Sequence, residues 1–147
     1  MRLLASTDFA LRVLMRLAAE PTAKPMSVEA LARDLGGLSR NHLHKIVQDL
    51  AALGAVRTVR GAGGGVLLAV PPEELGVGAL IRRLEGDQPI VECFRADAGN
   101  CSLSPGCRLR GFLRDAREEF YRRLDGHTVA DCLEPPRARP AAMAQVG

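Results

Sequence analysis

Three cysteines lie within fifteen residues of one another, Cys93, Cys101 and Cys107, in the spacing C-x7-C-x5-C. Thiolates are the preferred protein ligands of iron–sulfur clusters and of zinc. The segment around them shows no helical or alternating pattern, so we expect a loop, from which three sulfurs can converge on one point. Cys107 lies near the start of a predicted helix, whose dipole favours its thiolate. These residues are therefore candidate metal or cluster ligands.

The spacing of these cysteines leaves three interpretations open. An iron–sulfur cluster is one and zinc is another, although structural zinc sites usually contain closely spaced cysteine pairs and none occurs here. The third is a set of buried free thiols, which the polar neighbours Arg95, Asp97 and Asn100 disfavour. Cys132 stands apart on a short apolar segment, so we expect it to be structural.

A second group of polar residues occupies one face of a predicted helix. The apolar residues of this helix recur at helical spacing and form one stripe: Leu43, Ile46, Val47, Leu50 and Leu53. The polar residues lie opposite this stripe or in the first turn, where Arg suits guanine, Asn and Gln suit adenine, and Lys suits phosphate. The residues that we expect to contact DNA from this helix are Ser39, Arg40, Asn41, His42, Lys45 and Gln48. The alternative is an ordinary solvated face, which every surface helix has.

Two short β-prone runs flank the glycine-rich segment 61–65 and predict a β-hairpin. Arg57 and Arg60 lead into its tip, where Gly63 and Gly64 lack side chains, so that the backbone can approach a groove or phosphates closely. A loop that binds nucleotide phosphates is the alternative. It is disfavoured because the sequence has no G-x-x-x-x-G-K-S/T motif and the loop leads into a strand.

Hydrophobic periodicity predicts the elements that position these groups. Thr7 can cap a first amphipathic helix, Ser27 can cap a second short one, and Gly54 ends the third. A short helix over 75–84 and a long helix over 109–124 follow the hairpin. Helix, short helix, turn, helix and hairpin is the order of a winged helix-turn-helix. The expected fold is therefore mainly α with a small β-hairpin wing.

The composition is compatible with a DNA-binding protein in the cytoplasm. The 147 residues carry a formal net charge of +3, which is mildly basic. No apolar run approaches the roughly 20 residues that span a bilayer, and charges interrupt the apolar start of the chain, unlike a signal peptide. We expect no membrane association and a cytoplasmic location, where disulfides are rare, so the four cysteines need another role.

Three segments of the chain resemble the nitric-oxide-sensitive repressors called NsrR, within a wider family of iron–sulfur regulators that includes IscR. They are STDFALRVLMRLA, SRNHLHKIVQDLAALGAVRTVRGAGGGVLLA and CSLSPGCRLRGFLRDAREEFYRRLDGHTVADCL. The resemblance implies a homodimer built on the long helix, with one cluster per subunit held by Cys93, Cys101 and Cys107. It further implies a carboxylate ligand from the partner subunit's first helix, which falls on Asp8. Arg110 stands where the IscR-like branch has histidine, so the resemblance favours the NsrR-like branch.

We therefore expect a repressor, and not an enzyme, that binds double-stranded promoter DNA and leaves it when nitric oxide attacks its cluster. The expected cofactor is a 4Fe-4S cluster, with a 2Fe-2S cluster as the alternative. A repressor that senses iron or cluster supply is a second interpretation. A small iron–sulfur redox protein is a third, which the lack of a C-x-x-C, flavin or nicotinamide motif disfavours. The expected domains are a winged helix-turn-helix DNA-binding domain (1–84), a cluster-binding loop (85–107), a dimerisation helix with a C-terminal segment (108–133) and a disordered tail (134–147).

Overall fold

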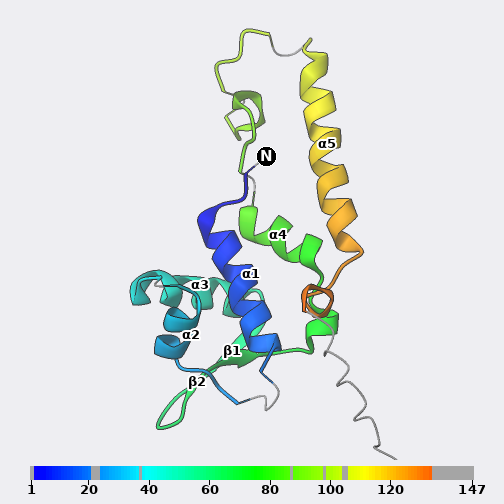
Figure 1. Ribbon diagram of the computed structural model, residues 1–147. Coiled ribbons are helices and arrows are strands. Elements are labelled where there is room, and N and C mark those ends of the chain that lie inside the picture. The colour runs from blue at the N-terminus through cyan, green and yellow to red at the C-terminus, as the bar shows by residue number, and fades with distance from the viewer. Residues whose placement is uncertain are drawn as a thin grey trace, which may run out of the picture.

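The structure, a computed structural model, describes residues 2–20, 24–36, 38–86, 88–97, 99–103 and 106–133. Its helices and strands are α1 (Ala5–Ala18), α2 (Val28–Asp34), α3 (Arg40–Ala52), β1 (Val56–Val59), β2 (Gly65–Leu68), α4 (Val77–Glu85) and α5 (Arg108–Asp125). The architecture is mainly helical with one antiparallel hairpin, as predicted (Figure 1). The predicted disordered tail lies outside the described residues. No helix within the described ranges is long and apolar enough to cross a membrane.

The first three helices and the hairpin share one hydrophobic core. Its deeply buried members come from each of these helices and from β2: Leu14, Leu31, Leu43, Leu50 and Val66. Burying one such side chain contributes about 1.5–3 kcal/mol relative to leaving it exposed. The backbone of Met26 exchanges two hydrogen bonds of 2.8 Å with Val66. Because a Cβ at Gly65 would lie 2.2 Å from the Met26 carbonyl oxygen, glycine permits this close approach.

Serine side chains cap two of the helices, as predicted. The Ser27 hydroxyl accepts a hydrogen bond of 3.1 Å from the Ala30 amide at the start of α2. The Ser39 hydroxyl accepts one of 3.3 Å from the His42 amide at the start of α3. Each cap satisfies one backbone donor that has no partner within its helix.

Thr7 does not cap α1, so this prediction is wrong. The helix begins at Ala5, and the Leu4 carbonyl already accepts the Asp8 amide at 3.1 Å. Thr7 lies three residues before Ala10 on the buried stripe of the helix, and it is only 1% exposed. Packing of this stripe therefore outweighs the capping preference of threonine.

α5 reaches away from the first three helices and is connected to them through α4 (Figure 1). Gly78 lies at the crossing of α4 and α5, where a Cβ would come within 2.6 Å of the Tyr121 carbonyl oxygen. Arg82 donates two hydrogen bonds of 3.3 Å to Asp125, which raise the pKa of Arg82. Its guanidinium also lies 4.7 Å from the centroid of the Tyr121 ring. This close crossing joins α5 to the rest of the described molecule.

Gly78→Ala is expected to destabilise the protein by about 1–3 kcal/mol, because the added methyl group overpacks the crossing against backbone atoms. Urea denaturation monitored by circular dichroism measures this change. Gly111→Ala is the matched control on α5, since its Cβ would meet nothing within 4 Å among the described residues. That control should gain about 0.5–1 kcal/mol from helix propensity. Equal stability of Gly78→Ala and the original protein would contradict the observed crossing.

Candidate nucleic-acid interface and cysteine site

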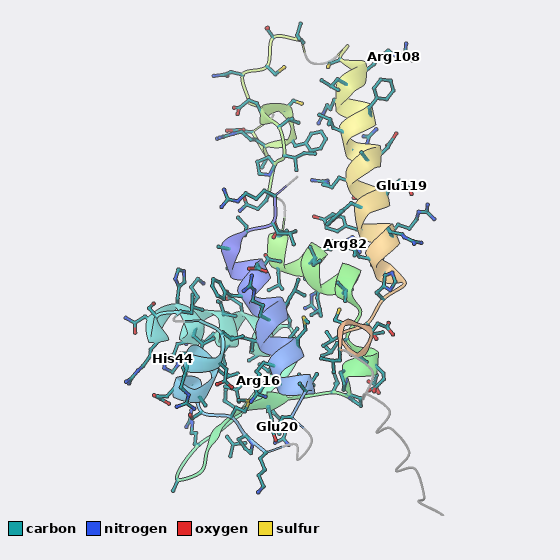
Figure 2. The ribbon with its side chains drawn as sticks, in the orientation of Figure 1. Arg16, Glu20, His44, Arg82, Arg108 and Glu119 are labelled. Carbon is teal, nitrogen blue, oxygen red and sulfur yellow. The ribbon has the colours of Figure 1, made fainter. Side chains whose placement is uncertain are left out.

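α3 presents its predicted polar face to solvent. The six residues of this helix and its cap that were expected to contact DNA are all exposed: Ser39, Arg40, Asn41, His42, Lys45 and Gln48. The opposite stripe, which includes Leu43 and Leu50, is buried against α1 and α2. Figure 2 places His44 of the same helix at the edge of the molecule. The predicted orientation of the helix is confirmed, while contact with DNA stays a prediction.

The hairpin between β1 and β2 extends from the core next to α2 and α3 (Figure 1). Arg57 and Arg60 are exposed on it. At the tip, Gly63 has a φ of +77°, which side chains disfavour. A Cβ at Gly64 would lie 2.3 Å from the Val59 carbonyl oxygen, so the turn closes only without a side chain there. The wing therefore combines exposed cations with a bare backbone tip.

Acidic residues pair with two cations of α3. Glu29 of α2 lies 3.5 Å from Arg40, and Asp49 lies 3.6 Å from Lys45. Between 46% and 73% of each of the four side chains is exposed, so solvent screens both pairs. No local pattern reveals Glu29, because its approach to Arg40 depends on the angle between α2 and α3.

The segment that connects α4 to α5, residues 86–107, carries all three candidate ligands, and we name it the cysteine loop. Cys93 lies in a short 3₁₀ turn, Cys101 lies further along the loop, and Cys107 is the residue that immediately precedes α5. All three are half-buried free thiols, whereas Cys132 is exposed. Partial burial and partial access together suit thiols that take up a metal or cluster.

The structure does not bring the predicted ligands together. Within the described part of the chain, no three His, Cys, Asp or Glu side chains lie close enough to hold one metal ion. Asp8 is half-buried in the first turn of α1, where its carboxylate pairs with Arg12 at 2.8 Å. The donors have the right chemistry for a cluster but lie apart, so the ligand set stays a prediction.

The first half of α5 leaves apolar side chains uncovered. Leu109 is 58% exposed and Phe112 is 60% exposed. A neighbouring apolar cavity of about 340 Å³ lies between the cysteine loop and α5 and is lined by Ile90, Val91, Leu113, Ala116, Arg117 and Phe120. The first half of α5 therefore exposes two large apolar side chains beside an apolar cavity.

The chain matches the Rrf2 family, described as an iron-dependent transcriptional regulator, over residues 3–135. The HTH-type transcriptional regulator NsrR of Geobacillus kaustophilus is 42% identical over 134 residues, which cover 91% of this chain and 90% of that protein. The NsrR of Bacillus subtilis is 39% identical and is matched over 91% of each chain.

Solved structures of regulators have the same fold. The oxidized form of Staphylococcus aureus CymR superposes with a TM-score of 0.72 at 28% identity, covering 94% of this chain and 100% of that one. T. potens IscR superposes with a TM-score of 0.68 at 26% identity, covering 90% and 85%. The resemblance to NsrR and the winged-helix fold are thus confirmed, and the relatives are named as regulators, as expected for a protein that is not an enzyme. The chain is a member of the Rrf2 family of iron-dependent transcriptional regulators.

Proposed function

We propose that the chain is a homodimeric repressor that binds double-stranded promoter DNA in the cytoplasm, holds an iron–sulfur cluster and leaves the DNA in response to nitric oxide. The observation that carries this proposal is the exposed polar face of α3 beside a glycine-tipped wing. In a helix-turn-helix protein such a face enters the major groove. The membership of the Rrf2 family and the identity to NsrR proteins support the same function.

The exposed residues of the interface have two kinds of role in this proposal, contact with bases and contact with phosphates. The planar guanidinium of Arg40 suits the two acceptors of guanine, and the amide of Asn41 suits adenine. Lys45 suits a phosphate, as do Arg57 and Arg60 on the wing. Base contacts supply the sequence preference, while phosphate contacts supply most of the salt-dependent affinity.

Cys93, Cys101 and Cys107 would hold the cluster. This assignment is supported by the state of the three cysteines, which are free, half-buried thiols in one loop. Thiolates are the donors that hold iron–sulfur clusters. No three potential ligands lie together within the described residues, so the convergence of these thiols on one cluster is part of the proposal. When bound, the cluster supplies iron that reacts with nitric oxide. Three thiolates and one oxygen ligand suit a 4Fe-4S cluster, with 2Fe-2S as the alternative.

The homodimer of the proposal is formed through α5. Its uncovered Leu109 and Phe112 would be buried by the second copy. Phe112→Glu is therefore expected to give a monomer in sedimentation velocity, because an unpaired charge in an apolar interface is costly. Gly111→Glu adds the same charge one residue away, off the apolar face of the helix, and should leave the dimer intact. A dimeric Phe112→Glu variant would rule out this interface.

Asp8 of the partner subunit is the proposed fourth ligand, as the NsrR resemblance implies. Asp8→Ala is then expected to change the visible circular dichroism of the reconstituted protein and to make its cluster more labile. Arg12→Ala is the matched control, since it removes the 2.8 Å ion pair but keeps the carboxylate. If Asp8 merely complements the dipole of α1, Asp8→Ala should cost about 0.3–1 kcal/mol and leave the spectrum unchanged.

Anaerobic reconstitution tests the function as a whole. The absorption spectrum, with iron and sulfide analysis, should show one cluster per subunit. Promoter DNA binding is then titrated with nitric oxide and, separately, with an iron chelator. Release by nitric oxide supports the proposal, whereas release by the chelator alone favours a sensor of iron or cluster supply. Failure to bind any promoter DNA would favour a redox protein instead.

A further inference from the structure

A cavity of about 270 Å³ lies between the cysteine loop and α5, away from α3 and the wing. The loop contributes Phe94 and Ala96 to its wall, and α5 contributes Arg110, Arg114 and Arg117. The spacing of these arginines places them on one face of the helix, where like charges repel one another. Three cations on the wall of a cavity favour the binding of an anion.

No carboxylate lines this cavity among the described residues. Arg114 and Arg117 reach only their sequence neighbours Asp115 and Glu118, each at 3.9 Å. Arg110 has no ion pair or hydrogen bond with any residue in the described part of the chain. By contrast, Arg82 of α4 is held by a carboxylate at 3.3 Å. Arg110 therefore has no carboxylate partner within the described residues, and the carboxylates that pair with Arg114 and Arg117 do not line the cavity.

One wall of the cavity is held in place by an aromatic contact. The guanidinium carbon of Arg117 lies 5.2 Å from the centroid of the Phe94 ring, within the range of a cation–π interaction. The Nε of Arg117 is buried and has no hydrogen-bond partner in the parts of the chain described. A buried hydrogen-bond donor without an acceptor is unfavourable. The oxygen atoms of a bound anion would supply the acceptor that this N–H group lacks.

DNA phosphates do not account for this charge. Figure 2 places Arg108, at the start of α5, at the opposite end of the molecule from His44 of α3. A duplex that contacts α3 and the wing therefore lies far from the first turns of α5. The anion that complements the cavity is therefore not a phosphate of that duplex.

We propose that this cavity binds a compact, multiply charged oxyanion: a phosphate ion or the phosphoryl group of a small phosphomonoester. Guanidinium groups match the oxygens of a phosphoryl group in pairs. The cavity volume of about 270 Å³ lies just below the range of ligand pockets, about 300–1,000 Å³, so the ligand is small. Because Phe94 directly follows Cys93, a bound anion ties the cysteine loop to α5. The proposal goes beyond the repressor function and does not depend on it.

Calorimetry and thermal unfolding of the full chain test this site. Sodium phosphate, sodium sulfate and methyl phosphate are each titrated against sodium chloride at the same ionic strength. We expect saturable binding and a raised Tm with phosphate or methyl phosphate, since a ligand of the folded state stabilises it. Tighter binding of methyl phosphate identifies a phosphomonoester as the ligand, and tighter binding of phosphate identifies the free ion.

Arg110→Gln should weaken this binding about tenfold, the effect of losing one charge-assisted hydrogen bond. Arg123→Gln, which removes the same charge from an exposed position of α5 outside the cavity, should change Kd by less than about twofold. Arg110→Lys keeps the charge but loses the planar fork, so it should bind with intermediate affinity. Effects of phosphate that never saturate, or equal losses in Arg110→Gln and Arg123→Gln, would overturn the proposal.

Discussion

Cys107→Ser is expected to yield a folded protein that assembles no iron–sulfur cluster, whereas Cys132→Ser should assemble one like the original chain. Cys107 is half-buried immediately before α5, and a serine hydroxyl is a poor substitute for a thiolate at a soft metal site. Cys132 lies beyond the other end of α5, about 27 Å away for eighteen residues at 1.5 Å each. It is therefore too distant to complete a site at Cys107.

The measurement is anaerobic reconstitution followed by the absorption spectrum and by iron and sulfide analysis. Far-ultraviolet circular dichroism of each variant shows that the helices are retained. Cys93→Ser and Cys101→Ser should lose the cluster as Cys107→Ser does. A normal cluster in Cys93→Ser together with none in Cys132→Ser would reverse the assignment of ligands.

The helices were predictable because each one carries its own local signal. The apolar stripe of α3 and the serine caps at Ser27 and Ser39 depend on residues within four positions of one another. The hairpin was predictable because glycines interrupt two β-prone runs. Thr7 was misread because its capping tendency and its place on the buried stripe of α1 conflict, and only the packed core decides between them.

The features that sequence reasoning missed depend on contacts between elements. Gly78 is an ordinary helix-weakening glycine in the sequence, and its role appears only where α5 crosses α4. Glu29 reaches Arg40 only through the packing of two helices. The spacing of the arginines of α5 can be read from the sequence. The sequence does not show that Phe94 lies opposite them and forms the other wall of the cavity. The three thiols could be identified by type and spacing, but spacing does not specify whether they converge, and the structure brings no three potential ligands together within the described residues.

Replacing the exposed residues of α3 is expected to weaken promoter binding in two distinguishable ways. Asn41→Ala should cost about 1–3 kcal/mol and relax the preference for one base pair, because the amide that reads adenine is removed. Lys45→Ala should weaken binding to all sequences alike. The salt dependence of DNA binding by this variant should also be weaker. The slope of log K against log salt concentration should fall by about one unit for each phosphate that the protein no longer neutralises.

A salt titration of binding to the promoter and to a mismatched duplex separates these two effects. Arg123→Ala is the matched control for Lys45→Ala, since it removes one exposed cation from α5, away from α3. Glu29→Gln frees Arg40 from its 3.5 Å ion pair and should tighten binding to the promoter, because Arg40 no longer gives up a carboxylate partner to reach guanine. If Arg40→Ala, Asn41→Ala and Lys45→Ala all bind like the original protein, α3 is not the helix that reads the DNA.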